Sequence, residues 1–394
     1  MEKVKLSNFI KQIRGVSYKP EDIRNESDKN AIPILRANNI TADGHIDLND
    51  IVYVDSKKVQ NEQLLRSGDI FICASSGSKN LVGKAVYIPT DMPYAFGAFC
   101  KVVRPVSENI DKHYLAQFFQ SPSYRKKISD LAQGANINNI KNEHIDELDI
   151  AIYSLEEQKA IAEKLDKVSG LIEKRKTQLK KLDLLIKSRF IEMFGDPVSN
   201  PLGWEKKTLK EVCVKLNDGT HFSPESFEVG EYKYVTAKNI KMSGFDFSNI
   251  TYVPEEVHRP IYERCNPELG DVLYIKDGVT TGIAMVNTLE EEFTLLSSVA
   301  LLKQDRRIMN GHFLTALLNN ESMYTDIRSN MGGAAITRLT IAKLNAIKVI
   351  VPSIELQEQF AYFVEQVDKS KFQIQKSLEK LEILKKSLMQ QYFG

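Results

Sequence analysis

A chain of 394 residues is long enough for two or three domains. Its hydrophobic content of 42% and charged content of 27% are those of an ordinary globular protein, and no apolar run approaches the ~18 residues of a membrane span. The formal net charge of only +1 argues mildly against nucleic acid as a partner, unless positive charge is concentrated locally or supplied by another subunit.

The N-terminal residues MEKVKLSNFI lack the apolar region of a signal peptide. The four cysteines are scattered and form no CxxC motif, so neither a disulfide framework nor a zinc site is indicated. We therefore expect a cytoplasmic protein that does not associate with a membrane.

The chain repeats itself at an offset of 199 positions. Leu179, Leu182 and Phe194 recur as Leu378, Leu381 and Phe393, and each copy ends in Phe-Gly. A repeat of this length indicates two whole domains rather than a solenoid. Two similar domains suggest a protein that reads two related targets.

Four segments follow in chain order. We expect a globular domain over residues 1–153, a long helix within 154–195, a second globular domain over 196–352 and a second long helix within 353–394. Both globular domains mix strand and helix patterns, so we predict the α+β class. The predicted strands cover 31–35, 69–73, 84–88 and 99–103 in the first domain, and 232–235, 271–275, 282–286 and 299–302 in the second, with short helices at 114–120 and 313–318.

The two long helices carry a heptad pattern, which is typical of a coiled coil. Ser154 and Glu157 have capping-box spacing, and Arg175, Lys371 and Lys385 interrupt the apolar seam. The seam consists of Ile161, Leu165, Val168, Ile172, Leu179, Leu182 and Ile186, followed by Phe360, Val364, Val367, Ile374, Leu378, Leu381 and Leu388. We predict an antiparallel coiled coil of the two helices; the alternative is that each helix packs on its own domain.

Paired polar loops lie at matching places in the two domains and are rich in amides, hydroxyls and basic residues. Asn and Gln suit adenine edges, Arg and Lys suit guanine, and hydroxyls suit phosphate. We predict DNA contacts from the following residues, although surface turns would explain any single loop as well: Arg14, Ser17, Tyr18, Lys19, Arg36, Asn38, Asn39, Ser75, Ser76, Ser78, Lys79, Asn136, Asn138, Asn217, Thr220, His221, Lys238, Asn239, Lys276, Thr280, Thr281, Thr337 and Arg338.

Motifs for catalysis are missing from the sequence. It contains neither GxGxxG nor GxxxxGK[ST], and it lacks the Asn/Asp-Pro-Pro-aromatic motif of an adenine methyltransferase. Its six histidines do not cluster at metal-ligand spacing. We therefore expect no catalytic residues, no metal and no cofactor.

Seven motifs follow one another in a fixed order along the chain. They are SLEEQKAIA at 154–162, FGDP at 194–197, GWEKKTL at 203–209, NDGTHFSP at 217–224, TAKNI at 236–240, GDVL at 270–273 and PSIELQ at 352–357. In this order the chain resembles the specificity subunit of type I restriction-modification enzymes. The first copy departs from the pattern at residues 14–20, and it has Tyr153 where the second has Pro352.

The resemblance implies two target-recognition domains, each reading one half of an interrupted double-stranded DNA sequence. It also implies a subunit that catalyses nothing itself and recruits two methyltransferase subunits and two ATP-driven restriction subunits. A coiled-coil scaffold with two protein-binding domains is one alternative. A stand-alone methyltransferase is another, which the missing motifs oppose.

Overall fold

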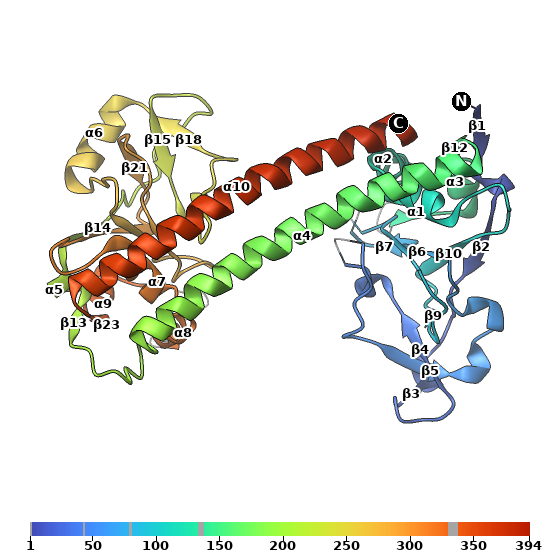
Figure 1. Ribbon diagram of the computed structural model, residues 1–394, viewed down its shortest axis with the longest axis horizontal. Helices are drawn as coiled ribbons and strands as arrows, with labels where there is room; N and C mark the ends of the chain where they lie inside the picture. The colour runs from blue at the N-terminus through green and yellow to red at the C-terminus, as the bar shows by residue number, and fades with distance from the viewer. Residues whose placement is uncertain (1, 42–43, 79–80, 133–137, 330–337) are drawn as a thin grey trace. The chain divides into compact units, whose positions relative to one another are not determined.

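The computed structural model describes residues 2–41, 44–78, 81–132, 138–329 and 338–394 (Figure 1). By internal contacts the chain divides into a first unit, residues 1–176 with 376–394, and a second unit, residues 177–375. Each long helix therefore contributes one part to each unit. The four segments expected from the sequence divide the chain at the helix ends instead, and those boundaries stay a prediction.

Two four-stranded sheets form the first unit. One has the antiparallel order β2 (Ile10–Arg14), β10 (Cys100–Pro105), β6 (Ile70–Cys73), β8 (Ala85–Tyr87), and the other has the order β3 (Ile23–Arg24), β5 (Val52–Asp55), β4 (Ala31–Leu35), β9 (Ala95–Phe96). Short pairs join β1 (Glu2–Lys5) to β12 (Asp149–Ile152) and β7 (Ser75–Ser76) to β11 (Asn138–Asn139). The helices are α1 (Lys112–Gln120), α2 (Pro122–Leu131) and α3 (Asn142–Asp146). All four residues of β6 are buried, as expected of a continuous apolar run.

The second unit repeats this plan. Its main sheet has the order β14 (Cys213–Asp218), β22 (Val299–Gln304), β19 (Val272–Ile275), β20 (Ala284–Val286), beside a sheet of β18 (Thr251–Val253), β15 (Tyr232–Val235) and β21 (Phe293–Leu295). Short pairs join β13 (Lys206–Thr208) to β23 (Lys348–Ile350) and β16 (Ile240–Lys241) to β17 (Gly244–Phe245). The helices are α5 (Leu209–Val212), α6 (Glu255–Arg264), α7 (Gly311–Leu318), α8 (Glu321–Ser329) and α9 (Ile341–Asn345). All eight predicted strands and both predicted short helices are confirmed, with ends that differ by at most two residues.

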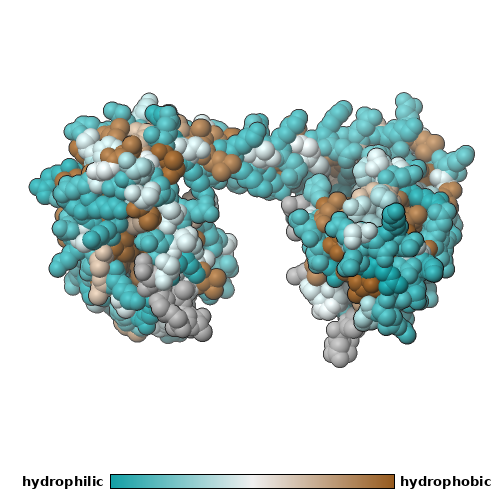
Figure 2. Space-filling view, turned by 90° about the horizontal axis from the view of Figure 1, so that it is seen from below, coloured by the Kyte–Doolittle hydropathy of each residue, from teal (hydrophilic) through white to brown (hydrophobic). Residues whose placement is uncertain are grey.

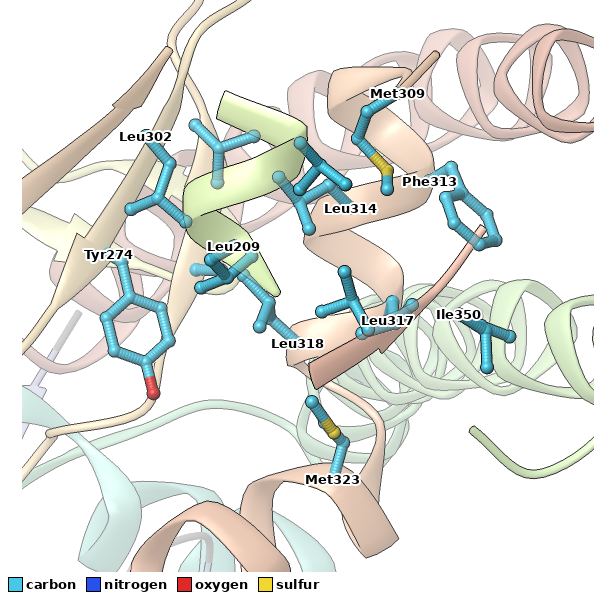
Figure 3. Packing of buried hydrophobic residues seen from close by; sticks show 14 of the residues in the cluster. Leu209, Tyr274, Leu302, Met309, Phe313, Leu314, Leu317, Leu318, Met323 and Ile350 are labelled. Atoms are coloured by element: carbon cyan, nitrogen blue, oxygen red, sulfur yellow. The ribbon is translucent and has the colours of Figure 1, made fainter. Parts of the chain in front are cut away.

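A cluster of buried apolar side chains holds the second unit together (Figure 3). Helix α7 carries Leu314, Leu317 and Leu318, which pack against Leu209 of α5 and the sheet residue Tyr274. Removing this apolar area from water is the main favourable contribution to folding of the unit. Helix α7 also packs against β19, whose last residue, Ile275, precedes Lys276.

The long helices α4 (Leu155–Phe194) and α10 (Ile354–Phe393) form where the heptad pattern predicts them. At the start of α4, the Ser154 hydroxyl donates to the Glu157 carboxylate at 2.7 Å, and the Glu157 backbone N–H donates to the same hydroxyl at 3.3 Å. Gly195, with φ +73°, follows α4 as the expected stop. The predicted capping box and helix end are confirmed.

The two helices pack antiparallel within the second unit. Lys371 of α10 pairs with Asp183 of α4 at 2.8 Å, and the Phe360 ring lies 5.6 Å from the rings of both Phe190 and Phe194. Buried seam residues are Ile161, Leu165, Val168, Ile172, Phe360, Val364, Val367, Leu378 and Leu388, whereas Leu179, Leu182, Ile186, Ile374 and Leu381 are half-buried. Seam residues such as Phe360 and Val364 also pack in the globular cluster of the second unit. The helices therefore pack both on each other and on a globular part.

The Phe-Gly end of each helix packs in the unit that does not contain its start. Phe194 ends α4 in the second unit, where its carbonyl accepts from Trp204 Nε1 at 2.9 Å and its ring lies 4.7 Å from that of Phe313. Phe393 ends α10 in the first unit, where its carbonyl accepts from the Ser123 hydroxyl at 2.6 Å and its ring lies 5.1 Å from that of Tyr114. Each unit is thus completed by the end of the long helix that begins in the other unit.

Among the described residues, no helix combines the length and the apolar character that crossing a membrane requires.

Candidate DNA interface

One glycine marks the same point in both units, at the end of the first strand of the main sheet. A Cβ atom at Gly15 would overlap the carbonyl oxygen of Gly97, and one at Gly219 would overlap that of Leu295. The next residue forms a parallel bridge in each case, Val16 with Gly97 and Thr220 with Leu296. Only glycine permits so close a backbone approach. Gly15 and Gly219 are therefore structurally equivalent, although the first copy departs from the sequence pattern at residues 14–20.

A buried ion cluster lies beside Gly219. Lys276 and Asp218 are 2% and 3% exposed, and the Lys276 ammonium lies 3.4 Å from Asp218 Oδ2 and 3.0 Å from Asp277 Oδ2. The sequence predicts that Lys276 contacts DNA, but its ammonium lies between two carboxylates of its own unit. We therefore assign it to support of the loops rather than to the contact surface.

Three exposed side chains surround this cluster. His221 Nε2 lies 3.1 Å from Asp218 Oδ1, Arg264 Nη1 lies 3.6 Å from the same oxygen, and Arg338 Nε lies 3.4 Å from Asp277 Oδ1. Arg264 also donates to the carbonyl of Gly219. These contacts hold three donors at one edge of the sheet, in a form that suits phosphate or guanine. Sequence reasoning missed Arg264, because a single arginine at the end of a helix carries no pattern.

The first unit places different side chains on the same frame. Arg14 takes the place of Asp218, while Ala74 and Ser75 take the places of Lys276 and Asp277. Lys101, buried nearby, donates to Gln12 Oε1 at 3.0 Å and to Asn142 Oδ1 at 2.8 Å. Burial lowers the pKa of the Lys101 ammonium to about 8.

Two predicted asparagines hold turns. Asn39 Oδ1 accepts the Arg36 backbone N–H at 2.7 Å, and its Nδ2 donates to the Asp47 carbonyl at 2.8 Å. Asn239 repeats this with Thr236 at 3.0 Å and Asp246 at 3.1 Å. Both side chains are buried. They stabilise the short 3-10 turns η3 (Ala37–Asn39) and η6 (Ala237–Asn239) and offer no free edge to a base.

The turns present their neighbours to solvent. Asn38 and Lys238 are exposed, and Arg36 is half-buried. Asp50 Oδ2 accepts from both Arg36 Nη2 and Asn38 Nδ2 at 2.7 Å. This shared carboxylate holds the two donors side by side at the tip of the loop.

The remaining predicted residues divide by exposure. Thr220 and Thr281 are buried, and their hydroxyls donate to the Phe222 carbonyl at 3.2 Å and the Gly278 carbonyl at 2.7 Å. Arg14, Ser17, Lys19, Ser78 and Thr280 are exposed, whereas Tyr18, Ser75, Ser76, Asn138 and Asn217 are half-buried. Lys79, Asn136 and Thr337 lie outside the described residues. For the exposed and half-buried residues, DNA contact remains a prediction.

Hydrophilic residues cover most of the face presented in Figure 2, with smaller hydrophobic areas among them. Within the ranges that the structure describes, no group of three or more His, Cys, Asp and Glu side chains could hold a metal ion.

Comparisons with known proteins agree on one family. Residues 1–182 and 201–385 match the model of the type I restriction modification DNA specificity domain. The chain is 43% identical over 225 residues to the StySPI specificity subunit of Salmonella potsdam, and 32% identical over 283 residues to the EcoKI specificity subunit of Escherichia coli K12. These matches cover 54% and 69% of the chain, but only 48% and 60% of those relatives.

Solved structures share the fold. The S subunit of a type I restriction-modification system from M. genitalium superposes with a TM-score of 0.60 at 16% identity, covering 100% of this chain and 96% of the other. A chain from a study of complex assembly in a type I R-M system superposes with a TM-score of 0.54 at 18% identity, covering 99% of both. At these identities the likeness extends to the fold alone.

Proposed function

Because the chain belongs to the family of the type I restriction-modification DNA specificity domain, we propose that it specifies a two-part DNA sequence, with one recognition domain for each half-site. In this role the chain catalyses nothing itself. It directs methyltransferase and restriction subunits to the sites that it reads in the cytoplasm.

The observation that carries this proposal is that the two units share one backbone arrangement but present different side chains on it. Gly15 and Gly219 fix the same backbone position, yet the residue before each is Arg14 in one unit and Asp218 in the other. Beside it, Asn139 pairs with Ser75 in the first unit, and Arg338 forms a bridge with Asp277 at the same place in the second. Two readers of different sequences need such a constant scaffold with variable edges.

Matched apolar side chains on the long helices support two copies of one partner. Leu184 and Leu185 of α4 are 60% and 46% exposed, and Ile383 and Leu384, 199 positions later on α10, are 69% and 45% exposed. Exposed apolar groups at equivalent places are typical of protein interfaces. We assign one pair to each of two methyltransferase subunits, with the restriction subunits joining that complex.

The weak net charge of +1 sets the expected affinity. Nonspecific DNA affinity depends on the number of phosphates that cations neutralise. We therefore expect the isolated chain to bind DNA weakly and the complex with methyltransferase to bind it well. Tight, sequence-selective binding by the isolated chain would contradict this expectation.

The test is a map of adenine methylation in cells that express the neighbouring methyltransferase with and without this chain. We expect a two-part methylated motif with an unread gap, present only when the chain is present. An otherwise competent methyltransferase that gains no new motif would refute the specificity role and favour a coiled-coil scaffold.

A further inference from the structure

The first unit contains a groove of about 810 Å³, lined by charged as well as apolar side chains, that the predicted DNA-contact loops do not account for. Its walls come from the loop around His45, strand β8, helices α1 and α2, and the parts of α4 and α10 that belong to this unit. Five cationic side chains line it: Lys84, Arg125, Lys176, Lys385 and Lys386.

Two of the three carboxylates that line the groove already have polar partners within the unit. Asp166 accepts from Gln117 Nε2 at 2.6 Å and lies 3.8 Å from His113 Nδ1. Glu173 pairs with Lys176 at 3.3 Å. Glu382 is the third carboxylate of the lining and is exposed. Five cations against three carboxylates leave the groove positive.

Lys385 is a half-buried cation of the groove wall. In the part of the chain that the structure describes, no carboxylate lies within ion-pairing distance of its ammonium. Burial, and then the nearby Lys176, lower the pKa of Lys385, since both disfavour the charged form; Glu173 and Asp166 act in the opposite direction without cancelling the shift. An anion placed between Lys176 and Lys385 would reverse that effect.

The second unit serves as an internal control for the groove. Lys84 and Ile283 are equivalent, because their carbonyls accept the backbone N–H groups of Cys73 and Ile275. Arg125 and Tyr324 are also equivalent, because each donates its backbone N–H to the carbonyl of the residue before its helix, Ser121 or Asn320. By the 199-residue offset, Gln375 and Ile186 take the places of Lys176 and Lys385. Lys386 has a basic counterpart, Lys187, and the Arg125 guanidinium has one in Arg328, which donates to the Thr281 carbonyl at 2.8 Å as Arg125 donates to the Val82 carbonyl at 2.6 Å. Lys84, Lys176 and Lys385 have no basic residue at the matching positions. The fold therefore does not need the charge of these three lysines.

We propose that the groove binds backbone phosphates of the DNA strand next to the half-site read by the first domain. The inference rests on the proposed function and names a second contact for it. Two walls continue directly into predicted recognition loops: Ile40 and Thr41 follow the Arg36–Asn39 turn, and Lys84 follows the loop that begins at Ser75. Phosphate contacts hold the register of a protein on the duplex while base edges supply the sequence.

The experiment gives three groove lysines the residues that the second unit has at the same places: Lys84→Ile, Lys176→Gln and Lys385→Ile. A control variant loses three exposed lysines of the same unit outside the groove, Lys126→Gln, Lys127→Gln and Lys164→Gln. Both are assembled with the methyltransferase, and thermal melts establish folding. DNA affinity is then measured between about 50 and 200 mM salt, a range over which affinity that depends on several phosphate contacts falls steeply.

We expect the plot of log K against log salt to flatten by about 0.9 for each phosphate that the groove variant no longer neutralises. Affinity should fall alike for cognate and unrelated duplexes, and the control should keep the slope of the unaltered protein. A groove variant with the unaltered slope would overturn the proposal. An unaltered slope with weakened methyltransferase binding would overturn it in favour of an acidic partner segment.

A second measurement needs no altered protein. Single neutral methylphosphonates are placed along a cognate duplex, and loss of affinity should map to consecutive phosphates beside the first half-site. Insensitivity there, or tight binding of free nucleoside triphosphate by the complex without DNA, would overturn the proposal. If the unaltered complex shows no sequence-selective binding at all, the proposed function fails, which is a different result from a changed or unchanged slope.

Discussion

Replacing Lys276 by methionine separates support of the recognition loops from direct DNA contact. The Lys276 side chain is 2% exposed, and its ammonium lies 3.4 Å from Asp218 and 3.0 Å from Asp277. Methionine keeps most of the side-chain volume and removes the charge. Loss of one partner from a buried pair costs about 3–5 kcal/mol. Because His221 and Arg264 still face Asp218, we expect the lower end, about 3 kcal/mol.

Trp204 is the single tryptophan and makes the assay selective for the second unit. Its Nε1 donates to the Phe194 carbonyl at 2.9 Å, and its ring packs against the buried cluster of that unit. Urea unfolding followed by its fluorescence should show a midpoint lowered by about 1 M, for an m-value of about 3 kcal/mol per M. The double variant Asp218→Asn with Lys276→Met should cost less than the sum of the single variants.

Two outcomes would refute this reasoning. One is a Lys276→Met protein whose unfolding free energy lies within about 0.5 kcal/mol of the unaltered value, as for an ordinary surface residue. The other is unchanged stability together with a flatter salt dependence of DNA binding, which would show that Lys276 contacts DNA directly.

The close backbone approach, the buried Lys101 and the exposed helix residues each lead to a further test. Gly219→Ala should destabilise the second unit by about 1–3 kcal/mol, the range for overpacking, because its Cβ would overlap the Leu295 carbonyl; a urea midpoint by Trp204 fluorescence equal to that of the unaltered protein would contradict this. Burial lowers the pKa of Lys101 to about 8 from 10.5, so the unfolded chain binds more protons between these values, and stability should rise with pH across this window by at most about 1.4 kcal/mol per pH unit. Lys101→Met should abolish that rise in circular dichroism melts at pH 8–10, and a rise that persists would show another group to be responsible. Changing Leu184 and Leu185 to serine should leave complexes with one methyltransferase, as should changing Ile383 and Leu384, and mass photometry that finds two methyltransferases in each variant would sink the docking assignment.

The long helices could be predicted because their signals are local. The 3.5-residue apolar spacing, the Ser154–Glu157 capping box and the glycine stop all lie within one segment of chain. The strands are likewise written as short apolar runs between turns. Neither signal says which unit a helix end joins, because Phe393 meets Tyr114 across 279 positions of sequence.

The candidate interface was harder to predict than the fold. A lysine after a buried strand looks the same in sequence whether it faces solvent or, like Lys276, a carboxylate 58 positions earlier. Thr281 and Asn239 have polar side chains that the sequence cannot distinguish from those of exposed neighbours such as Thr280 and Lys238. Which polar group a loop buries is decided by tertiary contacts, and local composition does not encode them.

The exchanged helix ends have a consequence for biosynthesis. The second unit is one continuous stretch, residues 177–375, whereas the first needs both residues 1–176 and residues 376–394. A ribosome therefore finishes every residue of the second unit before it makes the segment in which Phe393 packs on Tyr114. The unit that is started first is completed last, and a nascent or truncated chain lacking that segment leaves an apolar site open on its N-terminal part.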